Sequence, residues 1–207
     1  MVITADWARA RGYSGEPDQP TIDGLHHVFP RIACEVALRA VVLEGMIAVS
    51  VEFDAERIIK WFNDQQIWDA VSPREQGFLL NDLRSVQDRF NFFWRIEAQW
   101  ALLWMIRKIE TLGLPTQVRD DSGLVDEIIP AIGADVHEFI TSAQLRDADV
   151  IIAEDLRAYD LWCDACAVRR KKESLPVDLN WDVLYERRYA FEWLDGLDEW
   201  DQVTCDA

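Results

Sequence analysis

The stretch SVQDRFNFFWRIEAQWALLWMIRKIETLG (residues 85–113) limits the possible folds of this chain more than any other. Between Phe90 and Ile106 it is apolar almost all the way round a helix of 3.6 residues per turn. A helix without a polar face has to be surrounded by other elements. We therefore predict a central, buried helix from Ser85 to Leu112, which Gly113 ends. One narrow polar stripe runs along it, formed by Asp88, Asn91, Arg95 and Gln99.

Helical patterns also precede and follow this stretch, and the sequence has no convincing strand pattern or Asn-Gly hairpin signal. RIACEVALRAVVLEGMIAVSV (31–51) has the helical period, although its end could also be a strand. Ser72, Pro73 and Glu75 have the spacing of an N-cap, a first helical residue and a capping box. Further helices are predicted after Asp54, at 147–172 with RRKK in its last turn, at about 182–194, and as short pieces within 116–145. The predicted fold is an all-α, single-domain helical bundle of about six or seven helices over residues 29–207, after an irregular arm at 1–28.

The charge of the chain limits its partners. A chain of 207 residues is expected to form one domain, and its net charge of −17 repels nucleic acid and anionic membrane surfaces. The same field attracts a cationic protein, although acidity alone also serves solubility. We see neither a signal peptide nor a membrane span, so we expect a soluble, cytoplasmic protein. The sequence does not indicate the oligomeric state.

The cysteines and histidines do not suggest a metal or cofactor site. Cys163 and Cys166 form a C-x-x-C, but it lies inside a predicted helix without a second pair, so we interpret both as small buried residues. The three histidines are His26, His27 and His137, and adjacent side chains such as the first two rarely converge on one metal. The chain also lacks G-x-S-x-G, P-loop, G-x-G-x-x-G and H-E-x-x-H motifs. We expect no cofactor, no metal and no catalytic residue.

Four charged residues lie on otherwise apolar helical stripes: Glu97, Asp155, Glu186 and Arg187. An unpaired charge in such a place is costly, so each should have a partner. In one interpretation, Arg187 or Arg95 binds the three carboxylates and fixes how the helices pack. In the other, the three carboxylates form a cluster for acid–base work or for a hard metal ion.

The C-terminal segment has six acids from Glu192 onward and no Lys or Arg. We interpret it as a candidate contact surface for a basic partner, formed by Glu192, Asp195, Asp198, Glu199, Trp200 and Asp201. Trp193 lies on the helical stripe and should pack on the core. Trp200 is open to two roles, an exposed interface anchor or a second ring packed on the core.

Three blocks of the sequence resemble the bacterial family called domain of unknown function 4272. The family has the patterns W-R-x-E-A followed by L-L-W-A-L, D-L-x-Y-R-x-H-W, E-R-x-x-A-L-x-W-L and W-D-x-V-x-x-D-T. The residues that match them are Trp94, Arg95, Glu97, Ala98, Leu103, Trp104, Asp155, Leu156, Trp162, Glu186, Arg187, Ala190, Trp193, Leu194, Trp200, Asp201, Val203 and Asp206. Ala158 and Leu161 depart from the pattern, where Tyr and His are expected. The resemblance covers about residues 25–207 and implies a helical bacterial protein without an established activity.

From these observations we expect a non-enzymatic, acidic interaction protein that binds a cationic protein, as the immunity protein of a bacterial toxin does. The alternative is an enzyme or metal-binding protein that uses the carboxylates of Glu97, Asp155 and Glu186.

Overall fold

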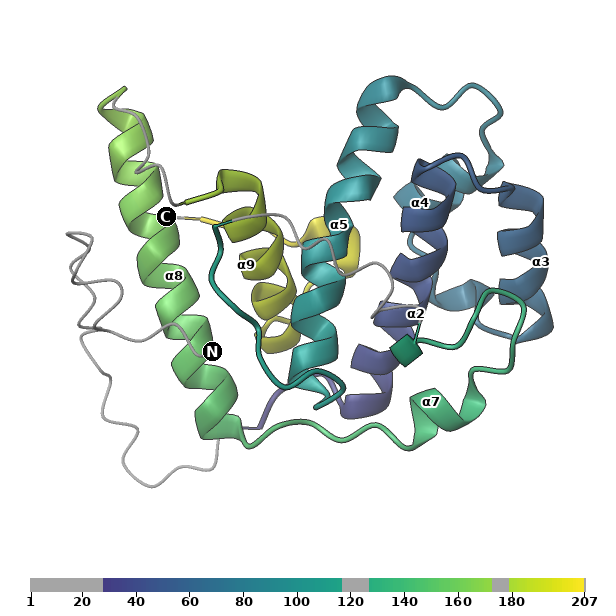
Figure 1. Cartoon of the computed structure of the whole chain (residues 1–207), viewed down its shortest axis with the longest axis horizontal. Coiled ribbons are helices and arrows are strands. Elements are labelled where there is room, and N and C mark those ends of the chain that lie inside the picture. Colours follow the sequence, from purple (N-terminus) through teal and green to yellow (C-terminus); the bar gives the residue numbers. More distant parts are fainter. Residues whose placement is uncertain (1–27, 117–126, 173–178, 207) are drawn as a thin grey trace.

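The computed structural model describes residues 28–116, 127–172 and 179–206, and every regular element within these ranges is a helix (Figure 1). Helix α5 (Val86–Met105) lies between α2 (Ala33–Ser50) and α9 (Trp181–Asp195), and α8 (Ala148–Arg170) packs on the outer side of α9. The prediction of an all-α domain around a long buried helix is confirmed. Within the described ranges there are seven α-helices and two short 3-10 helices.

The far side of α2 is covered by a group of shorter elements. These are α3 (Ala55–Asp64), the 3-10 helix η1 (Trp68–Ala70), α4 (Pro73–Leu80) and α7 (His137–Thr141). Helix α2 is continuous through Ser50, so its alternating end does not form a strand. The predicted caps are present, because Asp54 accepts a hydrogen bond from Glu56 N and Ser72 forms a capping box with Glu75.

Gly45 permits the close approach of α2 and α3. A Cβ atom at this position would lie 2.5 Å from Phe62 Cζ and 2.7 Å from Ile58 Cγ2. Both of those α3 side chains are fully buried. The crossing of the two helices therefore depends on the missing side chain at position 45.

The predicted helix 85–112 is too long, because α5 ends at Met105. Arg107 has a φ of 60°, and the N–H groups of Arg107 and Lys108 donate to the carbonyls of Trp104 and Leu103 at 3.1 and 2.9 Å. These are the two hydrogen bonds of a Schellman ending, in which glycine is the usual left-handed residue. Here the guanidinium of Arg146 also donates to the Trp104 carbonyl at 2.6 Å, so a long-range contact helps to end the helix.

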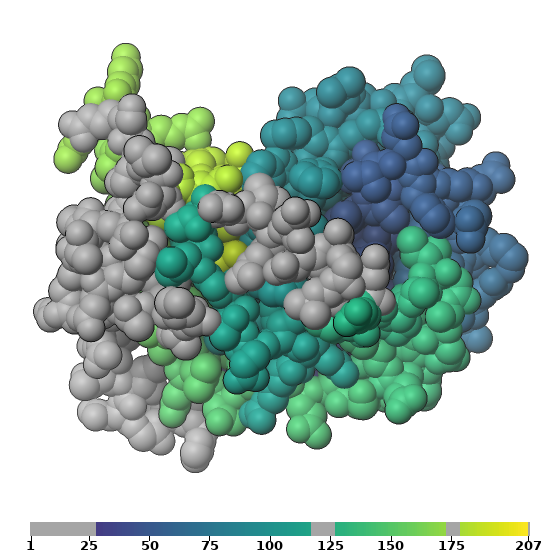
Figure 2. Space-filling model, in the orientation of Figure 1, coloured from purple at the N-terminus to yellow at the C-terminus, as the bar shows by residue number. Residues whose placement is uncertain are grey.

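Most of the buried apolar side chains form one core around α2 and α5, and a smaller cluster joins α8 to α9. The smaller cluster contains Leu161, Trp162, Ala165, Leu179 and Leu184. Figure 2 shows the end of α8 standing apart from the start of α5, with α9 visible between them. None of the helices in the described part of the chain is both long enough and apolar enough to cross a bilayer. The predicted arm at 1–28 lies almost entirely outside the described residues.

Candidate functional site

The three carboxylates singled out in the sequence each bind a different arginine. Arg187 donates to Glu97, Arg95 donates to Glu186, and Arg188 donates to Asp155. Within the ranges that the structure describes, no group of three His, Cys, Asp or Glu side chains is placed to hold a metal ion. The carboxylates therefore belong to ion pairs between helices, and the pairs join α9 to α5 and to α8.

The Glu97–Arg187 pair is the most deeply buried of the three. Glu97 is 0% exposed and Arg187 is 3% exposed. Nε and Nη2 of Arg187 donate to Glu97 Oε2 at 3.0 and 2.9 Å, and Nη1 donates to the Gly113 carbonyl at 2.9 Å. Since removal of one partner leaves a charge in a dry place, this pair fixes α9 against α5.

The Arg95–Glu186 pair lies among aromatic rings. Arg95 Nη1 donates to Glu186 Oε2 at 3.1 Å, and its guanidinium lies 3.9 Å from the ring centroid of Tyr189. Burial raises the pKa of Glu186, and the positive charge of Arg95 opposes this effect. Burial likewise raises the pKa of Tyr189 to about 12. The Tyr189 hydroxyl therefore stays protonated, and it donates to the carbonyl of Trp200.

Asp155 is less buried than its place on the α8 stripe predicts. Its side chain is 24% exposed, whereas the neighbouring Glu154 is buried and binds Arg157 at 3.0 Å. Asp155 binds Arg188, which also binds Glu192. Glu154 lies next to Asp155, and Arg188 lies next to Arg187. The periodicity of the sequence assigned the buried positions to Asp155 and Arg187, so it missed Glu154 and Arg188.

Of the two roles expected for Trp200, the structure shows packing on the core. The side chain is 4% exposed, and its ring contacts those of Tyr189 and Trp193 edge-on at centroid distances of 4.9 and 5.5 Å. The guanidinium groups of Arg39 and Arg95 lie 5.0 and 5.4 Å from its centroid. Trp200 is therefore not available as an exposed anchor, and it instead ties the C-terminal segment to α2 and α5.

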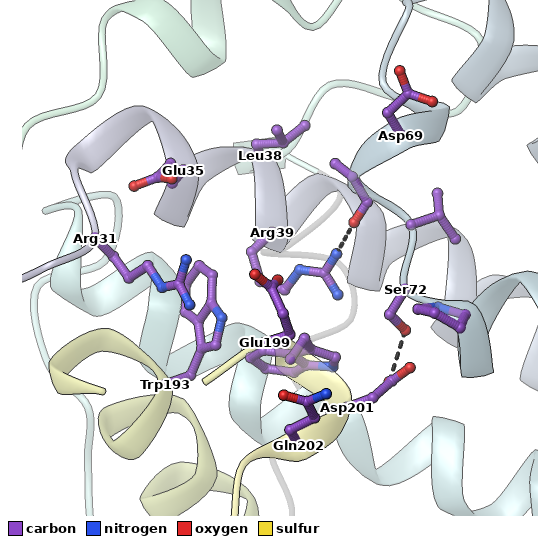
Figure 3. A pocket seen from close by; sticks show the side chains of 14 residues that line it. Arg31, Glu35, Leu38, Arg39, Asp69, Ser72, Trp193, Glu199, Asp201 and Gln202 are labelled. Carbon is purple, nitrogen blue, oxygen red and sulfur yellow. Dashed lines mark hydrogen bonds between the residues drawn. The ribbon is translucent and has the colours of Figure 1, made fainter. Parts of the chain in front are cut away.

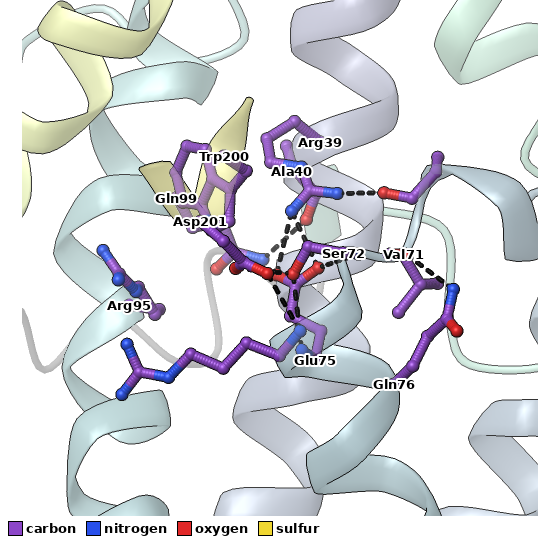
Figure 4. Close-up of polar contacts among 12 residues, drawn as sticks. Arg39, Ala40, Val71, Ser72, Glu75, Gln76, Arg95, Gln99, Trp200 and Asp201 are labelled. Atoms are coloured by element: carbon purple, nitrogen blue, oxygen red, sulfur yellow. Dashed lines mark hydrogen bonds and ion pairs between the residues drawn. The ribbon is translucent and has the colours of Figure 1, made fainter. Parts of the chain in front are cut away.

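Arg39 belongs to a fourth buried ion pair that sequence reasoning did not find (Figure 4). Its Nη1 donates to both carboxylate oxygens of Glu75, at 2.8 and 2.9 Å, and its Nη2 donates to the Ala70 carbonyl. Glu75 also accepts a hydrogen bond from Ser72 N at 2.8 Å. In the sequence, the capping-box pattern already accounts for Glu75, so nothing there indicates its ion pair with Arg39.

The acids of the C-terminal segment have different surroundings. Asp201 accepts hydrogen bonds from the Ser72 hydroxyl at 2.7 Å and from Arg74 N at 2.9 Å, so it helps to cap α4. Glu192 is half-buried against Arg188. Asp195, Asp198 and Glu199 are exposed.

A groove of about 530 Å³ lies between this segment and α2 (Figure 3). We call it the α2–η2 groove, after α2 and the 3-10 helix η2 (Trp200–Gln202). Its lining consists of Arg31, Glu35, Leu38, Arg39, Asp69, Ala70, Val71, Ser72, Pro73, Trp193, Glu199, Trp200, Asp201 and Gln202. Three of the residues that the sequence assigned to partner binding, Glu199, Trp200 and Asp201, therefore share one concave surface.

The α2–η2 groove is acidic, because four acids and only two arginines line it. Arg39 is bound by Glu75, while Arg31 donates to the Asp198 carbonyl at 2.7 Å and lies 5.1 Å from the Trp193 ring centroid. Asp69 and Glu199 are exposed, and neither forms an ion pair with any residue that the structure describes. The groove thus offers two carboxylates without ion pairs, together with apolar lining side chains.

The cysteines and the described histidine do not add a site. Cys163 and Cys166 are free thiols on α8, and burial raises the pKa of Cys166. A raised pKa makes a thiol less reactive at neutral pH. His137 begins α7, and His26 and His27 lie outside the described residues.

Comparison with known proteins gives a family and no activity. No curated protein and no solved structure matches the chain. The family model described as "Domain of unknown function (DUF4272)" matches residues 4–203. Since the match covers nearly the whole chain, this protein belongs to the DUF4272 family.

Proposed function

We propose that this protein is a non-catalytic binding protein whose α2–η2 groove receives a basic segment of a protein partner. The observation that carries the proposal is the position of Asp69 and Glu199. Asp69 comes from η1 and Glu199 immediately precedes η2, both line the same groove, and neither has an ion pair with a described residue. A basic segment of a partner could pair its lysine or arginine side chains with these two carboxylates.

Other features of the groove support the same kind of ligand. Leu38, Val71 and Pro73 are apolar lining residues, along which the carbon stem of a lysine or arginine can pack. The net charge of −17 would speed the encounter with a basic protein. An immunity-type partner, a basic toxin, is one protein with this chemistry. In the alternative, Glu97, Asp155 and Glu186 would carry out acid–base or metal chemistry, for which each would first have to be released from its arginine.

A titration with a fluorescent lysine- and arginine-rich peptide tests the proposal. We expect the variant Asp69→Asn/Glu199→Gln to bind the peptide about thirtyfold more weakly than the unaltered protein, since each of the two lost charge pairs is worth roughly 1 kcal/mol. The matched control is Glu56→Gln/Asp149→Asn, which removes two exposed acids from α3 and α8 and changes the net charge equally. Equal weakening in both variants would mean that the peptide recognises overall charge, and the proposal would be wrong.

A further inference from the structure

A second pocket, of about 300 Å³, lies between α5 and the start of α9. Its volume is at the lower end of the range for small-molecule sites. Four aromatic side chains line it, Phe90 and Trp94 from α5 and Trp181 and Tyr185 from α9. Asn91, Arg95, Asp182, Glu186 and Arg74 complete the lining, and none of these residues lines the α2–η2 groove.

Two of the four charges in this pocket cancel. Arg95 and Glu186 are both buried and are bound to each other at 3.1 Å. Because the two side chains neutralise each other in this ion pair, they offer no net charge to a ligand.

The other two charges have no such partners. The Arg74 side chain is exposed, lies 5.7 Å from the ring centroid of Phe92, and forms no ion pair with any described residue. Asp182 is half-buried in the first turn of α9, and it likewise lacks an ion pair among the residues of the described ranges. The pocket therefore offers one cation from α4 and one anion from α9, beside aromatic walls.

The opposite charges of Arg74 and Asp182 determine which charges a ligand of this pocket should carry. A ligand that is only cationic would have to lie near Arg74, and a ligand that is only anionic would have to lie near Asp182. A small molecule that carries both charges close together meets an opposite charge at each end. The aromatic walls give an apolar body a favourable place.

We propose that this pocket binds a small zwitterion with an apolar side chain, which is the chemistry of a free hydrophobic amino acid. Its carboxylate lies at Arg74, its ammonium group lies at Asp182, and its side chain lies between the α5 and α9 aromatic rings.

The test uses the full chain and three related probes. L-phenylalanine carries both charges, phenethylamine lacks the carboxylate, and 3-phenylpropionate lacks the ammonium group. Binding is followed through the indole N–H signals of Trp94 and Trp181 in NMR titrations, with L-leucine and L-tryptophan as further probes. We expect phenylalanine to shift both signals and each single-charge analogue to bind at least about tenfold more weakly.

Two variants test which residue binds the carboxylate of the ligand and which binds its ammonium group. In Arg74→Gln, phenylalanine should bind no better than phenethylamine, and in Asp182→Asn no better than 3-phenylpropionate. Arg57→Gln is the control for the first, since Arg57 is an exposed arginine 4.9 Å from the Phe53 ring centroid. Asp149→Asn is the control for the second, because Asp149 has the same place in the first turn of α8. Both controls should keep the preference for phenylalanine.

Three results would overturn the proposal. The first is that none of the three amino acids shifts the Trp94 and Trp181 signals. The second is that phenethylamine or 3-phenylpropionate binds as tightly as phenylalanine. The third is that Arg74→Gln and Asp182→Asn keep the full preference. The analogues test the two charges in the unaltered protein, so the outcome does not depend on how well the variants fold.

Discussion

Asp155 joins α8 to α9 and carries a charge that its surroundings disfavour. Burial raises its pKa to about 6, the negative charges of Glu192 and Asp195 add to this effect, and Arg188 opposes it. The pKa in the unfolded chain is lower, near the ordinary value of 3.8. Between these two values the folded protein binds more protons than the unfolded chain, so the free energy of unfolding falls as the pH rises.

A comparison with Asp155→Asn isolates this pH dependence. We expect the free energy of unfolding of the unaltered protein, relative to the variant, to fall by about 1 kcal/mol between about pH 5 and about pH 7.5. Urea unfolding at both pH values measures it. A difference that stays constant, or that grows with pH, would contradict the raised pKa.

Glu97 tests the buried ion pairs at the scale of one residue. Glu97→Ala removes the carboxylate that binds Arg187, so we expect a loss of about 3–5 kcal/mol in the free energy of unfolding. The double variant Glu97→Leu/Arg187→Met removes both charges and should recover much of that loss. Chemical denaturation measures both variants. Normal stability in Glu97→Ala would mean that the pair does not hold α9 on α5.

The sequence indicated most of these charges and named Arg187 and Arg95 as candidate partners, but it did not indicate Arg188, which binds Asp155. Glu97, Glu186 and Arg187 were visible because they interrupt apolar helical stripes. The pair of Arg39 and Glu75 was not visible, since the capping box by itself accounts for Glu75 in the sequence. The end of α5 was missed for a related reason, because Arg107 takes the left-handed conformation that usually belongs to glycine. Local patterns predict helices and caps, whereas side-chain pairing between helices depends on the packed fold.

At the scale of elements, the contact between α2 and α3 depends on Gly45. Gly45→Ala would place a methyl group 2.5 Å from Phe62 Cζ and 2.7 Å from Ile58 Cγ2. We expect it to lower the free energy of unfolding by about 1–3 kcal/mol, although alanine favours helix more than glycine does. Gly77→Ala is the matched control, because Gly77 is in α4 and has no atom within 4 Å of a new Cβ. That control should be stabilised by up to about 1 kcal/mol, and thermal unfolding compares the two. Equal effects at both positions would contradict the close approach.

The C-terminal segment is held in place chiefly by Trp200. Trp200→Ala removes the ring that contacts Arg39, Arg95 and Tyr189, so we expect a loss of about 3–5 kcal/mol. Faster hydrogen exchange should follow in residues 197–206, and binding at the α2–η2 groove should weaken because the groove loses a wall. Leu197→Ala, at a side chain that is 85% exposed in the same segment, serves as the control. Unchanged exchange in Trp200→Ala would show that other contacts hold the segment.

At the scale of the whole molecule, the net charge of −17 and the α2–η2 groove would make separable contributions to the binding of the proposed basic partner. Overall charge acts over a distance, weakens with added salt, and accepts any basic partner. The groove adds a fixed position for two carboxylates, which overall charge cannot provide. The pocket between α5 and α9 is a separate surface. The test of its proposed ligand does not depend on whether a partner binds at the groove.

Capture from a cell lysate of the source organism tests whether a basic protein binds at the α2–η2 groove. Tagged unaltered protein, Asp69→Asn/Glu199→Gln and Glu56→Gln/Asp149→Asn would be compared at low and then moderate salt. We predict that the unaltered protein and the control each retain the same basic protein in equimolar amount, that the groove variant loses it, and that rising salt releases it. Retention of that protein by the groove variant, or the absence of any equimolar basic protein, would contradict the account.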